Sequence, residues 1–219
     1  MDKGQTDFDI SAFKIDRYPV TEGEFFEFTQ QEPAWGSRKM LPLFADSRYL
    51  SHWRNGIPAK KALRHPVIQV SWFAADAFCR KRGGRLPTLL EWEYVAAASE
   101  SSRDANKDLA FVEKILAWYS RPIQAENLSD IGKGLPNAYG VHDFHQIVWE
   151  WTADFNSVFV NADNRADGDK IQNMFCGAGS IAANSKEDYA AFMRYATRSS
   201  LTARSTTKSL GFRCAYENN

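Results

Sequence analysis

The sequence lacks several features from which a function is usually assigned. Cysteine is scarce, with three in 219 residues, so at most one internal disulfide can form and one thiol is left over. No apolar run approaches the roughly 18 residues that a membrane-spanning helix needs. The first residues are polar, so we expect that an export signal, if the precursor carries one, has been removed.

No charge of either sign dominates. Lysine and arginine number 27, as do aspartate and glutamate. This balance gives no support for general binding to nucleic acids or to acidic membranes, although local patches are not excluded. With 44% hydrophobic and 25% charged residues, the composition is that of an ordinary globular protein, and we expect one domain over residues 1–219.

Common catalytic motifs are missing as well. There is no G-x-S-x-G sequence of a serine hydrolase, and the Gly-Ala-Gly-Ser segment at 177–180 is not followed by the Gly-Lys-Ser/Thr of a phosphate-binding loop. Hydrolysis by a serine nucleophile and nucleotide binding by a P-loop are therefore disfavoured.

The N-terminal region predicts a strand and a capped helix. Residues 10–16 alternate between apolar and polar side chains, which favours a strand with one buried face. Thr21 and Glu24 match the T-x-x-E capping box of a helix start, and three phenylalanines follow directly. Residues 30–65 contain prolines, glycines and scattered aromatic rings, so we expect an ordered loop there.

Three further helices are predicted in the middle of the chain. Ser71 caps the first, which ends in three cations and a glycine pair. Thr88 and Glu91 form a second capping box, for a helix that ends at about Ser99. A weaker helical pattern covers residues 108–118.

The last third favours short strands and turns. The predicted strands cover residues 148–152, 174–176, 192–197 and 212–216. No repeat is present, so the residue patterns indicate an α+β domain with much irregular loop.

A few residues could carry chemistry. His142 and His145 form an H-x-x-H pair, which needs a third ligand before it resembles a transition-metal site. Asp143 and Glu150 with intervening carbonyls match a hard cation such as calcium better. Cys176 is either a reactive thiol or a buried residue that only contributes to packing, and both interpretations stay open.

Taken together, several segments resemble the family of the formylglycine-generating enzyme, also called the sulfatase-modifying-factor family. The resemblance runs along nearly the whole chain in order. The matching segments are FKIDRYPVT at 13–21, PV at 66–67, VSW at 70–72, GRLPT at 84–88, EWEY at 91–94, NAYG at 137–140, VWEWT at 148–152, GAGS at 177–180 and LGFRC at 210–214. The resemblance implies a single domain with a C-type-lectin-like core and long irregular loops.

The resemblance also implies calcium sites. The ligands of the first fall on the Asp143 side chain, the Gln146 and Val148 carbonyls and the Glu150 carboxylate. A second site would use Asn127 and the Leu128 carbonyl, although the loop that would complete it is shortened in this sequence.

Catalysis is where this sequence departs from the family. The family enzyme oxidises a substrate cysteine with copper(I) held by two cysteines after its Gly-Gly-Ser segment, and copper(I) prefers such soft thiolates. No cysteine follows Ser180 over residues 181–188, so copper and formylglycine formation are not expected. The pocket walls of the family fall on Trp149, Ser180 and Arg198, with Cys176 close by in the sequence.

The same resemblance implies how two of the three cysteines are paired. It implies a disulfide between Cys79 and Cys214, as in exported family members, and hence an oxidising compartment such as the bacterial periplasm or cell envelope.

Three functions are consistent with these observations. The first is an exported accessory or maturation factor for an envelope redox enzyme, such as a copper enzyme, with a protein or peptide as its partner. The second is an oxidoreductase with altered metal or thiol chemistry in the same pocket, and the third is a lectin-like module that binds peptide or sugar. The sequence does not indicate an oligomeric state.

Overall fold

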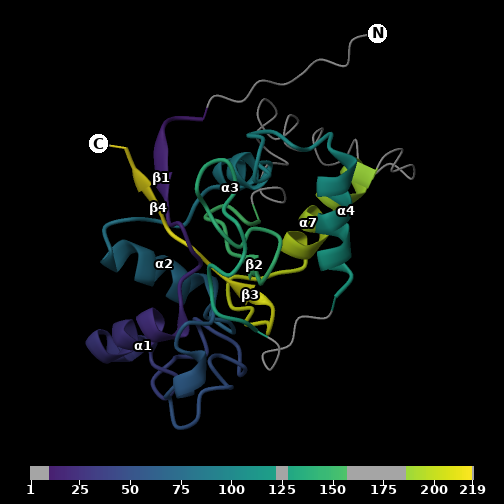
Figure 1. Ribbon diagram of the computed structural model, residues 1–219. Coiled ribbons are helices and arrows are strands. Elements are labelled where there is room, and N and C mark those ends of the chain that lie inside the picture. The colour runs from purple at the N-terminus through teal and green to yellow at the C-terminus, as the bar shows by residue number, and fades with distance from the viewer. Residues whose placement is uncertain (1–9, 122–127, 157–185, 219) are drawn as a thin grey trace, which may run out of the picture.

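The chain folds mainly into helices and loops, with little sheet (Figure 1). The computed structural model describes residues 10–121, 128–156 and 186–218. The helices are α1 (Glu22–Gln31), α2 (Trp72–Lys81), α3 (Leu89–Ala96), α4 (Leu109–Tyr119) and α7 (Lys186–Ser199), with short 3₁₀ helices η1 (Pro33–Trp35) and η2 (Lys60–Ala62). The strands are β1 (Phe13–Ile15), β2 (Trp149–Glu150), β3 (Leu210–Gly211) and β4 (Ala215–Glu217). An α+β domain with long irregular loops is confirmed.

The predicted helix starts are confirmed in chemical detail. In α1 the Thr21 side chain accepts the Glu24 amide while the Glu24 carboxylate accepts the Thr21 amide, and Thr88 and Glu91 do the same at α3. Each exchange satisfies two amides that the first turn leaves without partners. Ser71 caps α2, and the weaker pattern at 108–118 is the helix α4, capped by Asp108. The helix α3 ends at Ala96, three residues before the end predicted at about Ser99.

One predicted element is wrong. Residues 192–197, expected as a strand, belong to the helix α7. The aromatic residues in this segment favour a strand, but the alanines at 190, 191 and 196 are strong helix formers. Helical geometry also places Arg194 and Arg198 on one face, where both reach Glu93 on α3.

In the part of the chain that the structure describes, the sheet consists of two separate strand pairs. The antiparallel pair β1–β4 joins the two ends of the described chain, with Lys14 opposite Tyr216. The parallel pair β2–β3 sets Trp149 opposite Leu210 and Glu150 opposite Gly211. The predicted strands at 10–16, 148–152 and 212–216 are therefore present in shortened or shifted form, and 174–176 lies outside the described residues.

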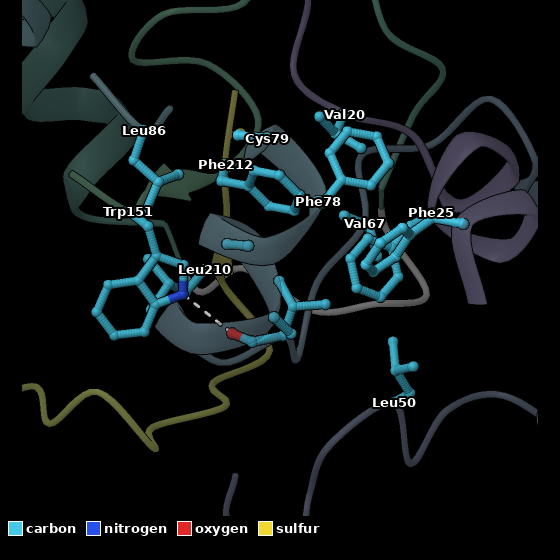
Figure 2. Packing of buried hydrophobic residues seen from close by; sticks show 14 of the residues in the cluster. Val20, Phe25, Leu50, Val67, Phe78, Cys79, Leu86, Trp151, Leu210 and Phe212 are labelled. Carbon is cyan, nitrogen blue, oxygen red and sulfur yellow. Dashed lines mark hydrogen bonds between the residues drawn. The ribbon is translucent and has the colours of Figure 1, made fainter. Parts of the chain in front are cut away.

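The main core lies between α1, α2 and the C-terminal strands (Figure 2). Phe25, Phe78 and Phe212 pack against one another, with ring centroids 5.4 to 6.0 Å apart. Trp151 is fully buried and donates its indole N–H to the Val70 carbonyl at 3.0 Å. These contacts explain why α2 and the last strands keep a fixed position relative to β2.

A disulfide joins Cys79 on α2 to Cys214, just before β4, with Cα atoms 5.5 Å apart. Both residues are fully buried. Beside it the chain passes so close to Gly84 that an added Cβ would lie 2.6 Å from the Ala215 carbonyl oxygen. This crossing therefore requires glycine.

Residues 30–65 form the expected ordered loop. It contains η1 and η2. Two of its aromatic side chains, Tyr49 and Trp53, are only 6% and 5% exposed because they pack into the core. In the described part of the chain, no helix is both long and apolar enough to cross a bilayer.

Candidate functional site

The strand β2 brings together the residues expected around the family's pocket and calcium loop. The Trp149 amide donates to the Ser209 carbonyl at 2.7 Å, and the Trp151 amide donates to the Gly211 carbonyl at 3.0 Å. Because successive side chains of a strand point to opposite faces, Trp149 and Glu150 enter different surroundings.

On one side, Glu150 enters a buried ion pair with Arg213. The guanidinium Nε lies 3.0 and 2.9 Å from the two carboxylate oxygens, and Nη2 lies 2.8 Å from one of them. Trp92 donates its indole N–H to the same carboxylate at 2.8 Å. Arg213 also donates to the backbone carbonyls of Asp16 and His142, at 3.1 and 3.0 Å. Through Arg213, Glu150 is thus linked to the chain after β1 and to His142. Through Trp92 it is linked directly to α3.

The loop expected to bind calcium presents oxygen atoms that suit a hard cation. Burial raises the pKa of the Asp143 carboxyl, and the nearby charge of Glu150 adds to the effect. One Asp143 oxygen accepts the Gly132 amide at 2.7 Å. Within the described residues, the other oxygen and the backbone carbonyls of Gln146 and Val148 accept no hydrogen bond. Asp143 thus supplies a buried carboxylate, and the two carbonyls that follow it in the sequence are of the kind that Ca²⁺ prefers, while Glu150 would share its charge with Arg213.

The second expected calcium site is incomplete in this structure. Leu128 begins the second described segment, but Asn127 lies outside the described residues. The prediction that these two residues bind calcium stays a prediction.

On the other side of β2, a charged cluster of Glu93, Arg194 and Arg198 lies between α3 and α7. Arg194 Nε contacts both Glu93 oxygens at 3.0 and 2.9 Å, and Arg198 Nη1 contacts one at 2.8 Å. Burial disfavours the Glu93 anion, but the two guanidinium groups outweigh it and hold its pKa at about 2. One carboxylate therefore faces two cations, and the cluster keeps one positive charge.

Arg198 has a further donor to offer. Its guanidinium lies over the Trp92 ring, 4.6 Å from the centroid. Its Nε is buried, and no hydrogen-bond partner for it exists among the described residues. A buried N–H without an acceptor is costly, so a group that accepts from it would be stabilised there.

An aromatic stack links this cluster to Trp149. The Tyr119 and Trp149 rings are stacked with centroids 4.7 Å apart, and Arg194 donates to the Tyr119 hydroxyl at 3.2 Å. The same hydroxyl lies 3.2 Å from His145 Nδ1, and His145 Nε2 lies 3.1 Å from the Ala96 carbonyl. Because a carbonyl only accepts, Nε2 carries the proton and Nδ1 accepts from Tyr119.

These contacts make His145 a poor metal ligand. Burial lowers its pKa to about 3, so the ring is neutral, and both nitrogens are already engaged. His142 uses Nδ1 at 2.9 Å from the Gly134 carbonyl. Across the described ranges, no three His, Cys, Asp or Glu side chains converge on one point as metal ligands would. The H-x-x-H pair therefore does not form a transition-metal site with its described neighbours.

The other pocket candidates divide in two groups. Trp149 and Arg198 are brought to the same region through Tyr119, Arg194 and Glu93. Ser180 and Cys176 lie outside the described residues. The disulfide uses Cys79 and Cys214, so Cys176 is the one cysteine left over.

Sequence reasoning overlooked Glu93, Arg194 and Tyr119 as site residues. Arg194 was hidden by the strand predicted at 192–197. Its spacing of four from Arg198 was the signal that could have revealed it, because residues four apart share one helix face. Tyr119 follows the residues predicted as helix and carried no signal of its own.

Comparisons with known proteins identify the family of this chain. Residues 2–218 match the model of the sulfatase-modifying factor enzyme 1-like domain. The mouse protein named inactive C-alpha-formylglycine-generating enzyme 2 is 28% identical over 94% of this chain and 75% of its own length. The formylglycine-generating enzyme of Streptomyces coelicolor is 30% identical, over 76% of this chain and 59% of that protein.

Two more distant similarities complete the comparison. Hercynine oxygenase of Mycobacterium tuberculosis is 30% identical over 66% of this chain and 38% of that protein. Among solved structures, PvdO from Pseudomonas aeruginosa aligns over 94% of this chain and 80% of its own, with a TM-score of 0.47 and 19% identity.

Proposed function

Because this chain belongs to the family of sulfatase-modifying factor enzyme 1-like domains but keeps one cysteine outside its disulfide, we propose that it is an accessory or maturation factor for an envelope redox enzyme. It does not convert cysteine to formylglycine. The observation that carries the proposal is the Cys79–Cys214 bridge, which takes two of the three cysteines in the sequence.

The chain lacks the pair of thiolate ligands that copper chemistry would need. Copper(I) is a soft ion that two thiolates would hold, and the chain can supply only the Cys176 thiolate without breaking its bridge. The similarity to a mouse protein whose name calls it inactive agrees with this view. A fold kept without its oxidase ligands is suited to binding another protein.

The retained pocket residues support a protein or peptide partner. Trp149 offers an aromatic surface that is only partly buried, and the Nε of Arg198, which has no hydrogen-bond partner among the described residues, is a donor suited to a backbone carbonyl or carboxylate. The disulfide fits an oxidising compartment, so we place the protein in the periplasm or cell envelope.

Metal analysis tests the proposal directly. We expect the protein purified from its source to contain less than one copper or iron per chain, because no thiolate pair is present. With copper(I), oxygen and a cysteine peptide, mass spectrometry should find no formylglycine. One tightly held copper per chain, or any formylglycine, would contradict the proposal and favour the oxidoreductase alternative.

The accessory role has its own readout. Deleting the gene should lower the metal content and activity of an envelope redox enzyme in the same organism. A Trp149→Ala, Arg198→Ala variant should fail to restore them, whereas Leu109→Ser, at an exposed position on α4, should restore them fully. Unchanged envelope redox activities after deletion would refute the accessory role.

Calcium binding through Asp143, Gln146, Val148 and Glu150 is part of the proposal. Saturating calcium at about 100 times its dissociation constant stabilises a protein by roughly 2.7 kcal/mol, which for this size raises the melting temperature by roughly 5 to 10 °C. Because its pKa is raised, Asp143 becomes protonated at a higher pH than an ordinary aspartate does. A protonated carboxyl binds Ca²⁺ poorly, so calcium affinity should weaken on acidification.

Thermal melts with calcium and with a chelator measure this effect. Asp143→Asn should abolish the difference between the two melts. The matched control Asp104→Asn, at an exposed loop carboxylate, should leave it intact. Equal melting temperatures of the unmutated protein with and without calcium would show that these residues hold no calcium.

A further inference from the structure

Charge is unevenly distributed along this neutral chain. Residues 33–65, most of the loop between α1 and α2, contain seven lysines and arginines but one aspartate, and Glu32 just before them is paired with Lys81 at 2.6 Å. The other 186 residues hold the remaining 20 cations and 26 acidic residues. Figure 1 shows the loops between α1 and α2 gathered at one end of the molecule, opposite the labelled termini. One end of the molecule is therefore strongly basic.

Most of these cations are exposed and form no ion pair with residues that the structure describes. Arg48 is paired with Asp46 at 3.2 Å, and Arg64 lies 3.9 Å from Asp130. The other five are exposed, and none has an ion pair among the described residues. We call them the basic face: Arg38, Lys39, Arg54, Lys60 and Lys61.

Aliphatic side chains project from the same loop. Leu41, Leu43 and Ile57 are 58%, 69% and 55% exposed. Ile57 lines a groove of about 340 Å³ together with Arg38 and Lys39, which shows that aliphatic and cationic side chains share one surface. Exposed leucines beside unpaired cations are not explained by the packing of this chain.

Among the described residues, the acidic side chains of α1 form no ion pair with the cations of the basic face. Glu24 and Glu27 of α1 line a different groove, which α1 forms with Lys81 and Arg82 at the end of α2. Glu22 is buried and accepts from His52 and Trp53. The positive charge of the basic face therefore stays available to an outside partner.

We propose that the basic face, with Leu41, Leu43 and Ile57, binds the surface of an anionic phospholipid membrane. Lysine and arginine near such a surface are attracted by its negative potential, and aliphatic side chains at the tips of loops gain by entering the interface. Stable attachment of a peripheral protein needs two such signals, and this loop supplies both. An acidic protein could cover the same leucines, but exposed cations together with aliphatic side chains projecting from loops are the combination that a membrane interface attracts. This membrane contact is independent of the proposed accessory function.

Flotation of the full chain with lipid vesicles tests the proposal. The protein should float with phosphatidylglycerol–phosphatidylcholine vesicles and not with pure phosphatidylcholine vesicles, and binding should weaken as salt screens the charges. The variant Arg38→Gln, Lys39→Gln, Lys60→Gln should lower the partition coefficient on the order of a hundredfold, since each cation contributes roughly fivefold.

Matched variants separate this face from the rest of the surface. Lys107→Gln, Lys133→Gln, Lys208→Gln changes the net charge equally at exposed positions elsewhere and should bind nearly as well as the unmutated protein.

The aliphatic tips are tested in the same way. Leu41→Ser, Leu43→Ser should weaken binding about tenfold, whereas Leu109→Ser, Leu135→Ser, at side chains 62% and 72% exposed, should not. Absence of flotation with anionic vesicles at low salt, or equal losses in the control variants, would overturn the proposal. The first of these outcomes would leave an acidic protein as the partner of this face.

Discussion

Replacing Arg213 with methionine should lower the free energy of unfolding by about 3 to 5 kcal/mol, because the change leaves a buried carboxylate without its cation. Arg213 is fully buried, and Glu150, its partner, is 5% exposed. The guanidinium also lies 4.1 Å from the centroid of the Phe144 ring, so the side chain supports a second core cluster. Urea denaturation of the unmutated and variant proteins measures the difference.

Two controls make this result specific. Arg82→Met removes a guanidinium that is 40% exposed and lies 3.3 Å from Asp16, and such a surface pair should contribute less than about 1 kcal/mol. The double variant Arg213→Met, Glu150→Gln removes the uncompensated charge and should recover part of the loss. A loss for Arg213→Met no larger than for Arg82→Met would show that the buried pair does not hold the site together.

Removal of the disulfide should have an effect of similar size. The bridge spans 135 residues, and in the chain-entropy model a loop of that length stabilises by about 5 kcal/mol. The Cys79→Ala, Cys214→Ala variant should therefore unfold at much lower denaturant concentration than the oxidised protein. The double variant is preferable to either single one, because a single variant would leave one bridge cysteine as an additional unpaired thiol.

Thiol counting supplies the control for this prediction. Under denaturing, non-reducing conditions the unmutated protein should show one free thiol per chain, and Cys176→Ser should show none. Three thiols in the unmutated protein would contradict the bridge. A double variant as stable as the oxidised protein would show that the bridge contributes little to the folded state.

Local chemistry explains which parts of the fold were predictable. The helix starts at Thr21, Ser71 and Thr88 follow from side chains that satisfy amides a few residues away, so each signal is complete within one turn. The strands are two or three residues long and depend on partners far along the chain, which blurs their bounds. The helix α7 was missed because its aromatic residues outweighed its alanines in a local comparison.

The candidate site was predictable to a lesser degree. Asp143 and Glu150 were named from the residue pattern of a hard-cation site, and Trp149 and Arg198 through a family resemblance. The pairing of Glu150 with Arg213, 63 positions away, follows from the three-dimensional packing and from no spacing rule. The same holds for Glu93, whose two arginines lie 101 and 105 positions along the chain.

The pairing of β1 with β4 also governs when this protein can fold. Phe13 is hydrogen-bonded into register with Glu217, and Arg213 donates to the carbonyls of Asp16 and Arg17. The strand β1 therefore has no partner until residues 215–217 are available to pair with it. Contacts between such distant segments are expensive in loop-closure entropy and form late. We therefore expect the β1–β4 pairing to form late in folding, after most of the domain between the two strands has been brought together.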